Sequence, residues 1–146
     1  MTSYTERLWP TPWLFFACLL ILPAVTLMLT PINFTLAIIV AVLAYAAACW
    51  FLVLTSPRVT LTERGLQAGR ATLPREFIGA VEVLEGDELQ LAIGPKLDAR
   101  THLLLRGWVK TGVRIENTDP KDPAPFWIVS SRTPQELAAA LAPAAA

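Results

Sequence analysis

The chain joins a strand-and-turn pattern directly to a long uncharged segment. Residues 57–83 read PRVTLTERGLQAGRATLPREFIGAVEV, in which short β-prone runs alternate with turn residues and arginines. Immediately upstream, residues 8–57 carry no charged side chain, whereas residues 58–146 hold eleven of the twelve basic and eleven of the twelve acidic residues. The chain therefore divides into a membrane part, residues 1–56, and a water-soluble part, residues 57–146. The net charge of zero argues against nucleic acid as a partner.

Two apolar runs in the first part are long enough to cross a bilayer. Residues 13–30 (WLFFACLLILPAVTLMLT) and 34–54 (FTLAIIVAVLAYAAACWFLVL) contain eighteen and twenty-one uncharged residues. As helices they would measure about 27 and 32 Å, which matches a hydrocarbon core of about 30 Å. Only the turn TPIN (30–33), which begins with the last residue of the first run, joins them, so they are predicted to form an antiparallel transmembrane hairpin. Pro23 predicts a kink in the first span, which a membrane helix tolerates when neighbouring groups bond the freed carbonyl.

The basic residues that flank the two runs predict their orientation. Arg7 precedes the first run, four arginines follow the second, and the turn has none. Because positive flanks stay in the cytoplasm, we expect a multi-pass protein of the cell membrane with both termini cytoplasmic. A cleaved signal peptide is the competing interpretation, but the A-x-A at 44–46 comes after two apolar runs, too far from the N-terminus. Small residues recur on one face of the second run (Ala37, Ala41, Ala44 and Ala48), which favours packing within the hairpin over packing against another protein.

After Pro57 the hydrophobic pattern changes to a period of two. Val59 and Leu61 alternate with polar residues, as in a half-buried strand, and Glu63-Arg64-Gly65 is a turn. Further strands are predicted at 66–73 with an interruption near Gly69, and at 77–84, 101–106, 111–116 and 126–131. Residues 88–93 fit either a short helix or a strand.

A helix is predicted at residues 134–141. Thr133 suits the N-cap, Pro134 the first helical position, and Glu136 completes a capping box. Leu137 and Leu141 fall on one face. The fold expected for residues 57–146 is thus a small, mostly antiparallel β domain, a partly open barrel that this C-terminal helix closes.

The strand-and-helix segment resembles a known type of domain. VTLTERGLQAGRATLP, FIGAVEVL and WIVSSRTPQELAAAL are similar to bacterial pleckstrin-homology-like (PH-like) domains of small membrane proteins, which implies a PH-like split barrel. The whole chain, through YTERLWPTPW, RGWV at 106–109 and DPKDPAPFWIVSSRTP at 119–134, resembles an actinobacterial family of small, alanine-rich, two-helix membrane proteins of unknown function. That resemblance implies no catalytic residues.

Residues with catalytic or metal-binding chemistry are few and scattered. His102 is the only histidine, so a histidine-based triad or metal cluster would depend on it alone. Cys18 and Cys49 lie in the two spans, without metal-site spacing. Asp119 and Asp122 fit ordinary turn chemistry beside prolines. We therefore expect no enzyme activity, no cofactor and no metal site.

Two sets of residues form a candidate interaction surface. The arginines at 58, 64, 70 and 75 could attract anionic headgroups, although setting the topology is the favoured interpretation. Trp108 and Trp127 are either core residues or interface anchors. The function expected is a non-enzymatic, membrane-anchored scaffold or accessory subunit that binds another membrane protein. The alternative is a sensor of anionic lipid headgroups at the cytoplasmic surface. The sequence does not specify an oligomeric state.

Overall fold

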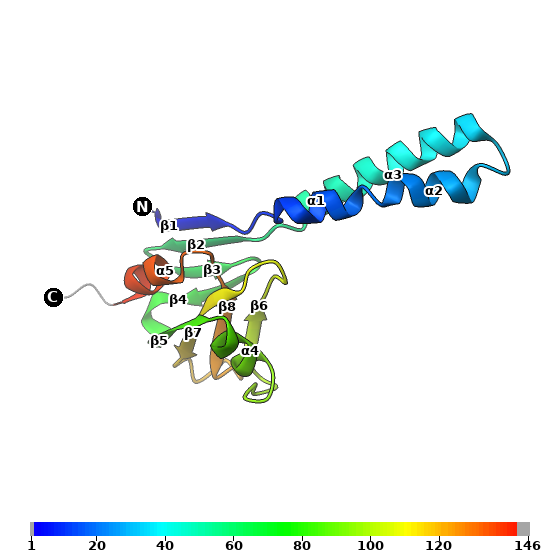
Figure 1. Ribbon diagram of the computed structural model, residues 1–146. Coiled ribbons are helices and arrows are strands. Elements are labelled where there is room, and N and C mark those ends of the chain that lie inside the picture. The colour runs from blue at the N-terminus through cyan, green and yellow to red at the C-terminus, as the bar shows by residue number, and fades with distance from the viewer. Residues whose placement is uncertain (1, 143–146) are drawn as a thin grey trace. The chain divides into compact units, whose positions relative to one another are not determined.

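The chain forms a helical unit inserted into a β unit. The computed structural model describes residues 2–142, with the backbone alone for residues 2 and 3 (Figure 1). Residues Trp9–Ser56 make up the helical unit, and residues up to Leu8 together with those from Pro57 onward make up the β unit. The sequence interpretation placed the boundary between residues 56 and 57 and grouped residues 1–56 with the hairpin. In the structure, residues 2–8 cluster with the β unit.

The helical unit contains three helices. These are α1 (Pro12–Cys18), α2 (Ile21–Leu29) and α3 (Phe34–Leu54). The predicted kink at Pro23 is a break between α1 and α2. Pro23 has no N–H to donate to the carbonyl of Leu19, and the backbone tightens there, with Leu19 N donating to Phe16 O at 3.1 Å. The second predicted run matches α3 residue for residue, and Asn33 caps it by accepting from Leu36 N at 3.1 Å.

The helices pack against each other through the alanine face of α3. α2 and α3 are in extensive contact, and Ala37 and Ala41 are buried. The segments Pro12–Leu29 and Phe34–Leu54 are both long and apolar enough to cross a membrane. Small side chains allow the close approach of two such helices.

Sheet A contains four antiparallel strands in the order β1-β2-β3-β4. They are β1 (Thr2–Arg7), β2 (Arg58–Thr62), β3 (Gly65–Ala68) and β4 (Ala71–Pro74). β1 was not expected from the sequence. The segment predicted as one interrupted strand is a hairpin of β3 and β4, since Gly69 takes φ +64° in the turn between them. Position 65 accepts only glycine, because a Cβ there would lie 2.2 Å from the carbonyl oxygen of Leu73.

Sheet B also has four strands, in the order β5-β7-β8-β6. A 3₁₀ turn, η1 (Arg75–Phe77), leads into β5 (Ile78–Glu85), and the other strands are β6 (His102–Leu104), β7 (Thr111–Asn117) and β8 (Phe126–Ser130). β6 runs parallel to β8, whereas the other pairs are antiparallel. The ambiguous segment is a helix, α4 (Asp87–Ile93), whose Leu89 packs with Leu84 and Ile128 on the outer face of sheet B.

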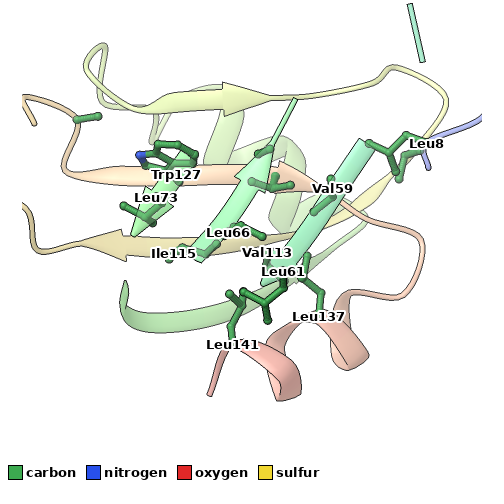
Figure 2. Close-up of a cluster of buried hydrophobic side chains, with 14 residues drawn as sticks. Leu8, Val59, Leu61, Leu66, Leu73, Val113, Ile115, Trp127, Leu137 and Leu141 are labelled. Carbon is green, nitrogen blue, oxygen red and sulfur yellow. The ribbon is translucent and has the colours of Figure 1, made fainter. Parts of the chain in front are cut away.

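The two sheets and α5 (Pro134–Leu141) enclose the main core. Figure 2 shows Leu137 and Leu141 of α5 pointing toward Leu61 and Val113 of the two sheets. The bounds of α5 and its buried leucine face are as predicted. The capping box is not formed, because the Thr133 side chain makes no cap bond and instead contacts the Tyr4 hydroxyl at 2.6 Å.

Candidate functional site

The four arginines of the predicted surface lie at two opposite ends of sheet A. Arg58 begins β2, and the β3–β4 turn that carries Arg70 is bonded to it through Gly69 N and Arg58 O at 3.0 Å. At the other end, Arg75 N donates to Arg64 O at 3.2 Å. The arginines are therefore not one patch. Arg7, which the sequence interpretation did not include, pairs with Arg58 across β1 and β2 and adds to the first end.

Arg75 contributes to the stability of the fold. Its guanidinium donates to the carbonyl of Ala140 at 3.3 Å, within the last turn of α5. A cation there satisfies a helix C-terminal carbonyl and complements the helix dipole. Among the four arginines of the predicted surface, Arg75 thus has a structural role, since it binds the last turn of α5.

Trp127 lies in the core and is not exposed at a surface. It is 4% exposed, and its ring centroid is 4.3 Å from that of His102, at 40° between the planes. Trp108 is half-buried and packs against the same core. The indole N–H groups of both tryptophans are buried without a hydrogen-bond partner among residues 2–142. His102 is therefore an aromatic packing partner of Trp127.

The two aspartates in the loop between β7 and β8 accept hydrogen bonds from N–H groups in and beside the same loop. Asp119 accepts from Lys121 N at 2.8 Å and Asp122 accepts from Ala124 N at 2.9 Å, while Asn117 Nδ2 donates to the other Asp122 oxygen at 2.9 Å. Within the described part of the chain, no group of three His, Cys, Asp or Glu side chains could hold a metal ion. These contacts are the turn chemistry that the sequence indicated.

A polar network joins β1 to the start of α5. The Glu6 carboxylate accepts from the Tyr4 hydroxyl at 2.8 Å, from Ser131 Oγ at 2.6 Å and from Arg132 N at 2.8 Å. Burial raises the pKa of Tyr4 above its ordinary value, against the lowering effect of its hydrogen bonds to Ser131 and Thr133. The network attaches β1 to the segment between β8 and α5.

A groove lies on the outer face of sheet B, beside α4. Its volume is about 300 Å³, and its lining includes Glu82, Glu88, Lys96, Arg114 and Phe126. The Arg114 guanidinium lies 3.7 Å from the Glu82 carboxylate and 4.0 Å from the centre of the Phe126 ring. The lining carries both signs of charge around an aromatic floor.

Sequence reasoning missed this groove for a physical reason. The outward position of Arg114 was readable, because Val113 and Ile115 point inward on either side of it. The groove also needs β5, β7 and β8 side by side, and α4 over one end. This arrangement of strands and helix brings together segments that are distant in the sequence, and no local sequence pattern predicts it.

Comparison with known proteins assigns the chain to a family. Neither the comparison with curated proteins nor the comparison with solved structures gave a match. A family model described as "Protein of unknown function (DUF3093)" matches residues 3–141, which covers both units of the structure. The chain therefore belongs to the DUF3093 family of proteins of unknown function.

Proposed function

We propose that the chain is a non-enzymatic, membrane-anchored accessory protein whose β unit binds a segment of another membrane protein. The exposed apolar surface of the helical unit supports the anchor. Trp13 is 72% exposed and Leu27 74% exposed, and little of either long helical segment is buried. A soluble protein rarely exposes so continuous an apolar surface, whereas a bilayer would cover it.

The β1–β2 pair supports a hairpin topology independently of charge. Leu8 N donates to Pro57 O at 3.0 Å, so the two ends of the helical segment are within hydrogen-bond distance. Helices that span a membrane must then leave and return on the same side. With the arginine flanks, this side is the cytoplasm. A reporter fused after Ala146 should be active if it is a cytoplasmic type, and activity of a periplasm-dependent reporter there would refute the orientation.

The proposal that the partner is a polypeptide rests on the groove at Arg114. Arginine and aromatic side chains are enriched where proteins bind each other, and Arg114 lies against Phe126. Glu82 and Glu88 stand beside Arg114 and Lys96, so both signs of charge line the groove. This mixture would repel part of an anionic lipid surface, and it complements a polypeptide segment that carries charges of both signs.

Site-specific photocrosslinking in intact membranes tests the polypeptide partner. A photoreactive residue in place of Leu91, which lines the groove and is 46% exposed, should give one adduct of defined mass. Arg114→Glu should abolish the adduct, since it adds a fourth carboxylate to a lining that already holds Glu82, Glu88 and Asp98. Lys121→Glu, an exposed charge reversal outside the groove lining, is the control and should leave it unchanged. An adduct equally strong from position 121, or one insensitive to Arg114→Glu, would refute this site.

A second candidate function is binding of anionic headgroups. The observation in its favour is that Arg7, Arg58 and Arg70 share the end of sheet A at which the chain enters and leaves the helical unit. Each basic residue near an anionic leaflet is worth about 1 kcal/mol, so three would give about 3 kcal/mol. Such binding is screened by salt.

Full-length protein in nanodiscs separates this candidate from the first. Amide hydrogen exchange of residues 67–71 should be slower in phosphatidylglycerol discs than in phosphatidylcholine discs, and the difference should vanish at high salt. Arg70→Gln should remove the difference, whereas Arg64→Gln, at the opposite end of the sheet, should preserve it. Equal exchange in both lipids would exclude headgroup binding at this end.

We further propose that the β unit is a divergent PH-like domain of an actinobacterial membrane protein. Two mostly antiparallel sheets closed by α5 support this kinship. The parallel pairing of β6 with β8 and the insertion of α4 are departures from the expected antiparallel barrel.

A further inference from the structure

A second cavity lies between α4 and the loop that connects β6 to β7. Its volume is about 160 Å³. Sites for drug-sized ligands measure about 300–1,000 Å³, so an occupant of this cavity is a small molecule or one small group. Its lining includes Leu89 and Ile93 of α4, Ser130 of β8, and Leu105, Arg106 and Lys110 of the connecting loop.

The lining combines an apolar wall with positive charge. Leu89, Ile93 and Val109 belong to the wall, and Arg106 and Lys110 supply two cations. No carboxylate is among the lining residues, in contrast to the mixed charges of the groove at Arg114. The electrostatic preference of this cavity is therefore for an anion.

Ser130 fixes the loop that carries Arg106 on the β8 side of the cavity. Its side chain is fully buried, and its Oγ accepts a hydrogen bond from Arg106 N at 3.2 Å. The Arg106 guanidinium donates to Leu105 O at 2.8 Å and keeps its positive charge.

We propose that this cavity binds a small amphiphilic anion, a carboxylate or phosphate that carries a short aliphatic group. The anionic head lies at Arg106 and Lys110, and the aliphatic part packs on the wall formed by Leu89, Ile93 and Leu105. Charge-assisted hydrogen bonds to a carboxylate or phosphate supply specificity for the head. The small volume limits the length of the tail. This site is separate from the partner groove and does not depend on the proposed function.

Calorimetric titration of the full-length protein in phosphatidylcholine nanodiscs tests the proposal, with empty discs as the blank. The probes are hexanoate, hexyl phosphate and the uncharged hexanol. At least one of the two anions should bind saturably, and hexanol should bind at least tenfold more weakly. Butanoate should bind more weakly than hexanoate by about fourfold for each methylene group removed. Failure of both anions to bind, or hexanol binding as tightly as they do, would overturn the proposal.

Two lysine variants locate the anion within the protein. Lys110→Gln removes a cation from the cavity at an exposed position, so folding is preserved, and it should weaken binding by about tenfold. Lys121→Gln removes an exposed cation from the β7–β8 loop, outside the cavity, and should leave the affinity unchanged. Equal affinities of the two variants would show that the anion does not bind at this cavity.

Discussion

The attachment of β1 through Glu6 gives a quantitative prediction. Glu6→Ala removes a half-buried carboxylate that accepts three hydrogen bonds, from Tyr4, Ser131 and Arg132. A hydrogen bond to a charged group contributes about 1.5–3 kcal/mol when buried, and Glu6 is partly exposed, so we take about 1 kcal/mol for each. The expected loss is about 3 kcal/mol. For a domain of this size that corresponds to a decrease in Tm of about 12–24 °C.

Glu6→Gln should have a smaller effect than Glu6→Ala. The amide oxygen of glutamine still accepts from Arg132 N, and the two hydroxyls of Tyr4 and Ser131 can rotate to accept from its NH₂ group. The remaining loss is that of charge assistance, about 1 kcal/mol or about 5 °C in Tm. The order of stability should be wild type, Glu6→Gln, then Glu6→Ala.

Thermal unfolding of the detergent-solubilised full chain measures these effects. Near-ultraviolet circular dichroism follows the packing of tryptophan side chains, among them Trp108 and Trp127 of the β unit. Glu76→Ala is the matched control, because Glu76 is exposed in η1 and the variant should melt like the wild type. If Glu6→Ala melts within about 2 °C of Glu76→Ala, β1 is not held through this carboxylate and the reasoning is refuted.

Three further predictions concern the same unit. Leu137→Asp should unfold it, because Leu137 is fully buried and an unpaired charge in the core costs several kcal/mol; a melt like that of the parent would show that α5 does not pack on the sheets. The pKa of Tyr4 is raised in the folded state. The stability that neutral Tyr4 contributes to the fold is therefore complete below the unfolded pKa, about 10, and is lost as the pH rises through the folded pKa. Tyr4→Phe should flatten the alkaline decrease in Tm, and an unchanged decrease would contradict this. A fragment of residues 57–146 should be less stable by circular dichroism than a variant in which a short glycine-serine loop joins Leu8 to Pro57, since only the latter retains β1.

Local patterns predicted the parts of the fold that local interactions determine. The uncharged run at 34–54 matched α3, and the proline-started segment at 134–141 matched α5. Alternation located most of the strands. The strand β1 was missed, because TSYTER is polar and its partner β2 begins about fifty residues later, beyond the helical unit. The weak local indication of β1 was that Tyr4 and Glu6 are two residues apart, which places both side chains on one face of a strand.

The candidate sites were predicted less well than the fold, since they depend on contacts across elements. Arg58 and Arg70 were chosen for their charge, but only the strand register brings them together with Arg7. Trp127 could not be assigned to surface or core, because both of its neighbours in β8 are apolar. The cavity at Lys110 combines α4, whose structure was ambiguous from sequence, with a loop and with Ser130 of β8.

The helical unit is, in topological terms, a connection between two neighbouring strands. Closing a flexible loop as long as Trp9–Ser56 costs conformational entropy that grows only with the logarithm of its length. Packed helices reduce this cost further, because contact between α2 and α3 already brings the segment's ends toward each other. Pairing of β1 with β2 and packing of the helices therefore stabilise each other. Glu6 also bonds Ser131 and Arg132, which follow it by 125 and 126 residues, so β1 is fully bound only when the rest of the β unit has been made.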